Sequence, residues 1–300
     1  MAAKAVPGVT SVTINMAAPA GAARPAPGPG VVPPPTPIEQ PNLGRVVAIS
    51  SGKGGVGKST VSANLAAALA ARGFRVGLMD ADIYGPNIPR MMGVDHKPLV
   101  TNGKMEPLVG HGVKVMSLGL LVERDAPAIW RGPIIMKIIQ QFLRDVDWGE
   151  LDYFLVDLPP GTGDAQLSLV QSTAIRGAVI VTTPQEMAVG DSLRGGKMFE
   201  RVGIPVLGVV ENMSYFVCPH CGERSAIFLS GGGARLAAEL KVPLLGQVPL
   251  QAEMPDLADM GRPIVVAAPT SPAGLALTAI SARLAELLPD RGRAAEPPGA

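Results

Sequence analysis

Gly52-Lys53-Gly54-Gly55-Val56-Gly57-Lys58-Ser59 is the stretch of sequence that decides the fold. It matches the phosphate-binding pattern G-x-x-x-x-G-K-S/T, and it stands in the setting that this pattern needs. An apolar run, Val46-Val47-Ala48-Ile49, precedes it, and a helix-favouring stretch from Ser59 to Arg72 follows it. Glycines let backbone N–H groups turn toward phosphate oxygens, and the helix N-terminus adds its dipole. The sequence therefore predicts a strand, a phosphate-binding loop and a helix, in that order.

Two lysines of this loop have separate predicted roles. Lys58 is expected to contact the β- and γ-phosphates of ATP, and the Ser59 hydroxyl is expected to coordinate Mg²⁺. Lys53, a second lysine early in the loop, resembles the deviant Walker A ATPases, which include the nitrogenase iron protein, MinD and ParA. That resemblance implies an ATP-sandwich homodimer in which Lys53 reaches the nucleotide of the partner. The candidate nucleotide-binding residues of the loop are Gly52, Lys53, Gly54, Gly55, Val56, Gly57, Lys58, Ser59 and Thr60.

Acidic residues follow two further strand-like runs. Arg75 to Met79 is followed by Asp80 and Asp82, and Asp157 closes another apolar run. A carboxylate at the end of a buried strand is the Walker B arrangement, so Asp157 is predicted to hold magnesium. Asp82 is predicted to position the attacking water, with a capping or turn role as its alternative. The candidate catalytic residues are Lys53, Lys58, Asp82 and Asp157, and a switch loop is expected from Pro159 to Asp164.

The order of the remaining patterns predicts the fold class. Further apolar runs at Ala178 to Val181 and Val206 to Val210 alternate with helical patterns. Strands that alternate with helices indicate an α/β fold with a mostly parallel sheet and helices on both faces. We expect one P-loop NTPase domain over residues 42–288. Residues 1–16 contain a single strand-like run, 17–41 are expected to be a disordered Pro/Ala-rich linker, and 289–300 a loose tail.

Composition and charge exclude some classes of protein. Lys+Arg 26 against Asp+Glu 25 gives a net charge of +1, without the basic excess that is typical of nucleic-acid binders. The first residues lack the pattern of a secretory signal, and no run of 18 or more apolar residues is present. From these observations we expect a soluble, cytoplasmic chain with neither nucleic acid nor a membrane as its partner.

The two cysteines of the chain, Cys218 and Cys221, form a Cys-x-x-Cys motif. Such a pair in a cytosolic chain is more often a metal or redox site than a structural disulfide. A zinc or iron–sulfur site usually needs four ligands, and one chain supplies two thiolates. A symmetric dimer doubles that supply at its axis. Zinc, an iron–sulfur cluster and a redox dithiol all fit the motif by itself.

Five motifs in one order resemble a known family. They are Ser51 to Ser59, Asp80 to Pro86, Trp130 to Pro133, Asp157 to Asp164, and Glu211 to Gly222. Together they are similar to the Mrp family of iron–sulfur cluster carrier ATPases, called ApbC in bacteria. The similarity covers roughly Asn42 to Leu288.

This resemblance implies a function for the cysteine pair. It implies a homodimer with a [4Fe–4S] cluster between two Cys218/Cys221 pairs, received from an assembly scaffold and passed to apoproteins under the control of ATP binding and hydrolysis. It also implies that Asn212 contacts adenine, although a turn-forming Asn is the alternative. The stretch from Ala5 to Met16 resembles the end of a small assembly domain that precedes the ATPase in many bacterial members, so the resemblance implies that residues 1–16 are a remnant of such a domain.

Three other readings remain open. The first is a positioning ATPase like MinD or ParA, but the last helical pattern, from Ala273, has few lysines for membrane binding. The second is a reductase component like the nitrogenase iron protein, although such relatives take their cluster cysteines from widely separated positions. The third is a dimeric ATPase bridged by zinc.

Overall fold

The computed structural model describes residues 40–82, 85–121, 132–161, 163, 166, 170 and 173–289. The described residues belong to the second of two units into which the chain divides after residue 35. The expected remnant at 1–16, nearly all of the expected linker at 17–41 and nearly all of the expected tail at 289–300 lie outside them, as do Trp130 and Asp164.

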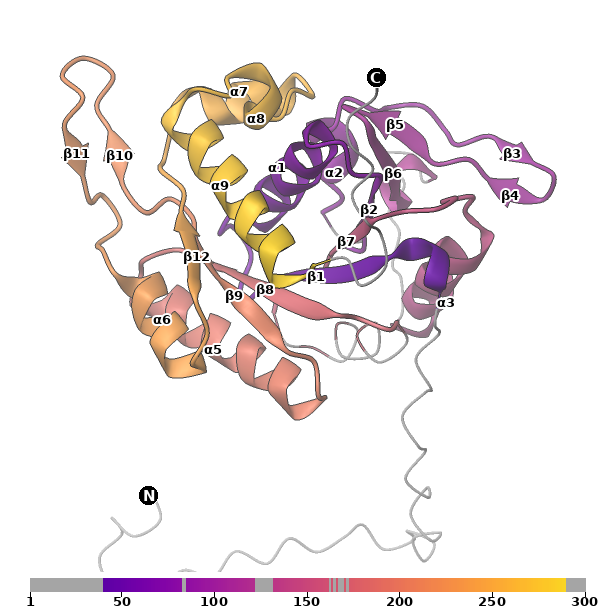
Figure 1. Ribbon diagram of the computed structural model, residues 1–300, viewed down its shortest axis with the longest axis horizontal. Coiled ribbons are helices and arrows are strands. Elements are labelled where there is room, and N and C mark those ends of the chain that lie inside the picture. Colours follow the sequence, from indigo (N-terminus) through magenta and orange to yellow (C-terminus); the bar gives the residue numbers. More distant parts are fainter. Residues whose placement is uncertain are drawn as a thin grey trace, which may run out of the picture. The chain divides into compact units, whose positions relative to one another are not determined.

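An eight-stranded sheet forms the centre of the fold (Figure 1). Its order is β12-β9-β8-β1-β7-β2-β6-β5, and every neighbouring pair is parallel except β5 and β6. The strands are β1 (Arg45–Ser51), β2 (Val76–Asp80), β5 (Leu108–Gly110), β6 (Val113–Ser117), β7 (Tyr153–Asp157), β8 (Gly177–Thr182), β9 (Val206–Glu211) and β12 (Leu244–Gln247). The predicted α/β class with a mostly parallel sheet is confirmed.

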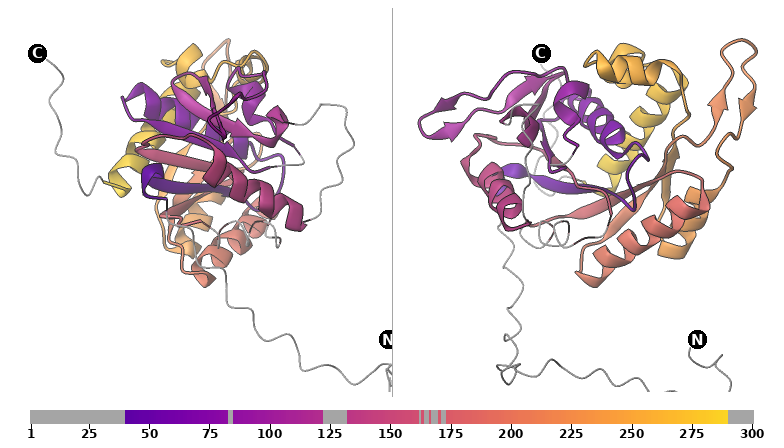
Figure 2. Two further views of the ribbon diagram at one scale, coloured as in Figure 1. Left: turned by 90° about the vertical axis from the view of Figure 1, so that its right-hand side faces the viewer. Right: turned by 180° about the vertical axis from the view of Figure 1, so that it is seen from behind.

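Helices cover both faces of this sheet (Figures 1 and 2). One face carries α1 (Lys58–Ala71), α2 (Ile88–Met91), α7 (Glu253–Asp259), α8 (Ile264–Ala267) and α9 (Pro272–Leu287). The other carries α3 (Gly132–Asp145), α5 (Glu186–Arg201) and α6 (Gly232–Leu240). None of the helices in the described part is long and apolar enough to cross a membrane.

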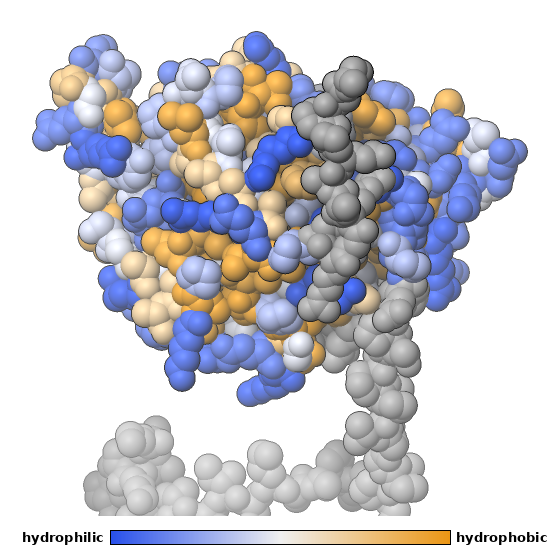
Figure 3. Space-filling view, viewed as in Figure 1, coloured by the Kyte–Doolittle hydropathy of each residue, from blue (hydrophilic) through white to orange (hydrophobic). Residues whose placement is uncertain are grey.

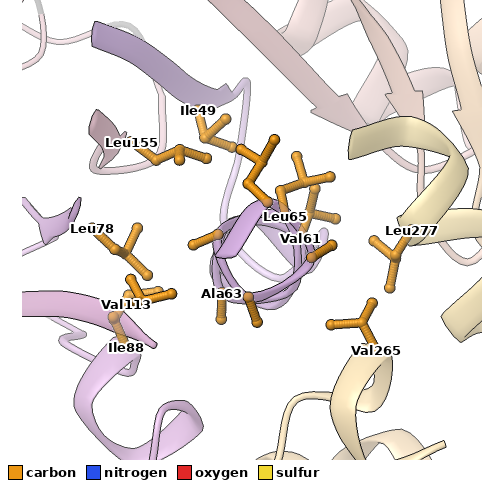
Figure 4. Packing of buried hydrophobic residues seen from close by; sticks show 14 of the residues in the cluster. Ile49, Val61, Ala63, Leu65, Leu78, Ile88, Val113, Leu155, Val265 and Leu277 are labelled. Carbon is orange, nitrogen blue, oxygen red and sulfur yellow. The ribbon is translucent and has the colours of Figure 1, made fainter. Parts of the chain in front are cut away.

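Alternation along β1 shows why the sheet has a core on each side. Val47 and Ile49 belong to the apolar cluster around α1 and α9, whereas Val46 and Ala48 belong to the cluster under α3, α5 and α6. Successive side chains of a strand point to opposite faces, so a strand buried on both faces becomes a continuous apolar run. Figure 4 shows the first cluster, in which side chains of α1 lie among those of the sheet, α8 and α9.

The short elements lie outside the main sheet. The 3-10 helices are η2 (Pro41–Leu43) and η3 (Leu118–Leu120). One two-stranded sheet pairs β3 (Val100–Thr101) with β4 (Lys104–Met105), and another pairs β10 (Phe216–Val217) with β11 (Arg224–Ser225). The β10–β11 hairpin stands out from the surface beside α7 and carries the Cys-x-x-Cys motif at its end (Figures 1 and 3).

The sequence predicted five strands of the sheet and missed three. The five predicted runs became β1, β2, β7, β8 and β9, and the predicted helix from Ser59 to Arg72 became α1. The missed strands β12, β6 and β5 lie toward the two edges of the sheet. β5 and β12 are short and contain glycine, and Lys114 interrupts the apolar run of β6, so these sequences carry a weaker apolar signal.

Candidate functional site

The phosphate-binding loop runs from the end of β1 to the start of α1. Gly55 and Gly57 both have φ +81, in the left-handed region that favours glycine. Gly52 has no room for a side chain: a Cβ there would lie 2.1 Å from the backbone carbonyl carbon of Asp191 in α5. The loop is therefore held tightly against the helix that follows β8.

Lys58 and Asp157 form a buried ion pair at the centre of this site. Lys58 Nζ lies 2.8 Å from Asp157 Oδ2, and the side chains are 6% and 0% exposed. The Ser59 hydroxyl lies 2.6 Å from the same carboxylate oxygen. The structure therefore brings the predicted phosphate lysine and the two predicted magnesium ligands together. Two oxygen donors suit a hard divalent cation, so Ser59 and Asp157 fit Mg²⁺ by their chemistry.

Ser62 belongs to this site and was missed by the sequence reading. Its hydroxyl lies 2.6 Å from Asp157 Oδ1, so both carboxylate oxygens of Asp157 have partners from α1. Ser62 stands four residues after Lys58, on the same face of the helix. That spacing was the available signal, because a carboxylate that pairs with Lys58 also lies within reach of a side chain one helical turn later. Thr60, also predicted to bind nucleotide, lies in the first turn and is partly exposed.

Asp80 stands directly beside Asp157 in the parallel pair of β2 and β7. Its oxygens accept from the backbone N–H groups of Asp82 (3.0 Å) and Ile88 (3.3 Å) and from the hydroxyl of Ser117 (3.1 Å). Burial, and next the neighbouring Asp157 carboxylate, raise the pKa of Asp80 well above its usual range.

Asp82, predicted to position water, lies at the rim of the same cluster. Its Oδ2 is 3.8 Å from Lys58 Nζ, and its side chain is 14% exposed. The loop lysine is thus shared between carboxylates from two neighbouring strands. Lys53 occupies the outer part of the loop, where its side chain is partly exposed.

Asn212 touches the phosphate-binding loop directly. Its side-chain amide donates to the carbonyl of Val56 at 2.8 Å, and a Cβ at Gly57 would lie 2.2 Å from the same nitrogen. The residue is almost fully buried. The structure therefore places Asn212 beside the predicted nucleotide site, while its contact with adenine stays a prediction.

Glu211, at the end of β9, is a second residue that the sequence reading left without a role. Its fully buried carboxylate accepts from Ser214 Oγ, from the backbone N–H of Gly233 and from Gln247 Nε2. These donors come from the turn after β9, the start of α6 and the end of β12. Such a set stabilises a buried carboxylate and joins three elements.

The hairpin presents the two cysteines at its exposed end. Cys218 is partly exposed and Cys221 is exposed, and neither is in a disulfide. The backbone N–H groups of Cys221 and His220 donate to the Cys218 sulfur, as does the Cys221 thiol, and these bonds lower the pKa of Cys218. The residues that the structure describes include no group of three or more His, Cys, Asp or Glu side chains suited to a metal ion.

A comparison with protein families identifies the chain. The model of the ParA family described as the NUBPL iron-transfer P-loop NTPase matches residues 42–285. The chain belongs to this family. The predicted phosphate-binding loop, residues 52–59, lies inside the matched range.

Relatives of this P-loop NTPase are close in sequence. The chain is 53% identical over 246 residues to the iron-sulfur cluster carrier protein of Synechocystis sp., which covers 80% of this chain and 70% of the relative. It is 50% identical over 238 residues to the iron-sulfur cluster transfer protein NUBPL of Mus musculus, covering 78% and 74%.

Solved structures agree with the NTPase fold. A nucleotide-binding protein from Archaeoglobus fulgidus, in complex with ADP, matches with a TM-score of 0.67 and 43% identity, covering 74% of this chain and 88% of that one. The cell division ATPase MinD of Pyrococcus furiosus matches with a TM-score of 0.63 over 82% of this chain and all of its own. At 24% identity, the likeness to MinD concerns the fold.

Asp80 makes the stability of this NTPase depend on pH. Because its folded pKa is raised, the folded state holds a proton that the unfolded chain releases above about pH 3.8. Its contribution to the free energy of unfolding is therefore full at acid pH, and it decreases as the pH rises toward the folded pKa. Asp80→Asn, which cannot ionise, should flatten this part of the pH profile of the urea midpoint in the nucleotide-free protein. An unchanged profile would contradict the assignment.

The lowered pKa of Cys218 predicts selective alkylation. In reduced, metal-free protein, the rate at which iodoacetamide modifies Cys218 should reach half its maximum below the ordinary value of 9.0, because the thiolate accepts backbone hydrogen bonds. Cys221→Ala should keep most of this shift, since the two backbone donors remain. Urea-unfolded protein is the control, and an identical midpoint in folded and unfolded protein would contradict the prediction.

Proposed function

We propose that this chain is an ATP-dependent iron–sulfur cluster carrier. Two copies hold a [4Fe–4S] cluster between their Cys218/Cys221 pairs, receive it from an assembly scaffold and transfer it to apo iron–sulfur proteins. Slow hydrolysis of ATP at the phosphate-binding loop accompanies the cycle. The observation that carries the proposal is the joint presence of a buried phosphate-loop site and an exposed, hydrogen-bonded thiol pair on the segment after β9.

The relatives support the choice of cargo. Relatives at about 50% identity include proteins named as iron–sulfur cluster carrier or transfer proteins, among them those from Synechocystis and mouse. MinD, which represents the positioning alternative, matches at 24% identity and shares the fold. The similarity therefore favours cluster transfer over a positioning cycle.

The geometry of the hairpin supports a metal role for the thiols. The backbone N–H groups of residues 220 and 221 point at the Cys218 sulfur, which favours the thiolate that binds metal. A four-thiolate cluster needs two more cysteines, and the sequence contains no others. A second copy supplies them when the two hairpins meet at a symmetry axis. The exposure of Cys221 leaves the pair open to such an approach.

The nucleotide site supports a change of state on binding. In the structure, the ammonium of Lys58 bonds to Asp157. A triphosphate offers Lys58 oxygens of higher charge, and magnesium offers Asp157 and Ser59 a replacement cation. Binding of Mg-ATP therefore exchanges one set of ionic partners for another in a buried site. Lys53 is proposed to reach the nucleotide of the partner, and Asp82 to orient the attacking water.

Anaerobic reconstitution with iron and sulfide tests the proposal. The wild-type protein should hold about four iron and four sulfide per dimer, with the broad absorption of a thiolate-bound cluster. Cys218→Ala should lose nearly all of both and keep its affinity for ADP, because the hairpin end lies outside the phosphate-binding loop. Transfer is then measured as activation of an apo [4Fe–4S] enzyme.

Other outcomes separate the alternatives. One zinc per dimer and no sulfide would support a zinc-bridged ATPase. A variant Cys218→Ala with full iron and sulfide would overturn the bridging model. A wild-type protein that binds neither metal, but whose ATPase rate responds to a membrane or to DNA, would favour the positioning class.

A further inference from the structure

A single turn connects the nucleotide side of the molecule to the thiol pair. At its start, Asn212 donates through its backbone to Thr182 and through its side chain to Val56 of the phosphate-binding loop. Cys218 follows six residues later, so the connecting chain spans at most about 20 Å. A displacement at Asn212 has a short covalent path to the hairpin.

The carboxylate of Glu211 holds this turn from inside the protein. Oε1 accepts from Ser214 Oγ at 2.5 Å and from Gln247 Nε2 at 2.8 Å, and Oε2 accepts from the Gly233 N–H at 2.5 Å. Gly233 lies in the first turn of α6, where the helix dipole favours a negative group. A Cβ at Gly233 would lie 2.6 Å from the Cβ of Glu211, so the helix start is packed directly on this side chain.

Backbone bonds attach the base of the hairpin to the segment after β12. Ser214 N–H donates to the Val248 carbonyl at 3.0 Å, and Leu250 N–H donates to the Tyr215 carbonyl at 2.7 Å. The base of the hairpin therefore moves with the turn, and the carboxylate of Glu211 fixes the turn to α6 and β12. Beyond the base, the cysteines lie at an exposed end.

We propose that Glu211 is a positioning residue that couples the phosphate-binding loop to the cysteine pair. A nucleotide that moves Val56, or that forms a hydrogen bond with the side-chain amide of Asn212, displaces the turn. The Glu211–Ser214 bond then transmits this displacement to the base of the hairpin. The thiols then change their exposure or spacing in response to nucleotide. This inference rests on the proposed function, in which nucleotide binding governs the cluster.

The charge and burial of Glu211 argue for this role. Its side chain is fully buried and faces away from solvent, so it makes no direct contact with a cluster at the hairpin end. A carboxylate in such a place is stabilised by its donors, and the loss of one donor leaves a lone pair without a partner. The turn and the helix start therefore hold their positions together rather than independently.

Thiol alkylation on the reduced, metal-free full chain tests the coupling. The rate at which iodoacetamide modifies the peptide with both cysteines is measured by mass spectrometry, with and without saturating Mg-ADP. Wild-type protein should change its rate about 5-fold or more, the lower end of ordinary coupling between two sites. Ser214→Ala, which removes the donor on the turn, should reduce this response to below about 2-fold while it keeps nucleotide affinity. Glu211→Gln should do the same.

A matched control and a second measurement make the outcomes distinct. Ser281→Ala removes a buried serine of α9 whose hydroxyl bonds to the Thr278 carbonyl, and it should keep the full response. If Glu211→Gln does not fold, Ser214→Ala decides the question. A full wild-type response in Ser214→Ala, or no response in wild-type protein that binds ADP, overturns the coupling. Iron and sulfide analysis of the same wild-type protein reports separately on the carrier function.

Discussion

Lys58→Ala is expected to lower the rate of ATP hydrolysis by about 10²–10³-fold, as the loss of one preorganised donor to a transition state does in other enzymes. The reason is that Lys58 is the buried cation of the phosphate-binding loop, 2.8 Å from Asp157 and 3.8 Å from Asp82. The measurement is phosphate release at saturating Mg-ATP. Iron and sulfide content after reconstitution should remain at the wild-type level, because the hairpin does not contact Lys58.

The same variant should also be less stable without nucleotide. Asp157 is fully buried, and the removal of its cation leaves a charge whose remaining partners are hydroxyl groups. Breaking a buried pair in this way costs about 3–5 kcal/mol of the free energy of unfolding. Lys53→Ala is the matched control, because Lys53 is partly exposed: it should lose hydrolysis while its urea midpoint stays near wild type. Equal stability losses in both variants would contradict the argument.

Gly52→Ala is expected to weaken ADP binding about 100-fold, the equivalent of about 2.7 kcal/mol. A Cβ at this position would lie 2.1 Å from the carbonyl carbon of Asp191 and 2.2 Å from the backbone nitrogen of Ser192, both in α5. Backbone atoms of a packed helix do not give way cheaply, so the loop itself must shift. Fluorescence titration with a labelled ADP measures the loss.

Gly54→Ala is the matched control for this prediction. Gly54 lies two residues further along the same loop, outside the left-handed region of φ, and a Cβ there would have no atom of the described residues within 4 Å. Its variant should bind ADP within about 3-fold of wild type, which is about 0.6 kcal/mol. A large loss at Gly54, or none at Gly52, would show that steric contact with α5 does not set the loop conformation.

The local chemistry of the site could be predicted from the sequence. The spacing of residues 52–59 between an apolar run and a helical run predicted β1, the loop and α1, because phosphate binding needs these residue types in consecutive positions. Asp80 and Asp157 were recognised because each stands at the end of an apolar, strand-like run. In a parallel sheet, the carboxyl ends of the strands meet at one edge, and the structure confirms that they do.

The tertiary structure alone decided which distant segments meet. The bond from Asn212 to Val56 joins residues 156 positions apart, and it exists because only β8 separates β9 from β1 in the sheet. Strand order is set by the packing of all helices on both faces, and no local pattern records it. The partners of Glu211 likewise come from a turn, a helix start and a strand end. The sequence thus determined the chemistry of each segment, whereas long-range packing determined that the nucleotide loop and the base of the cysteine hairpin share one buried junction.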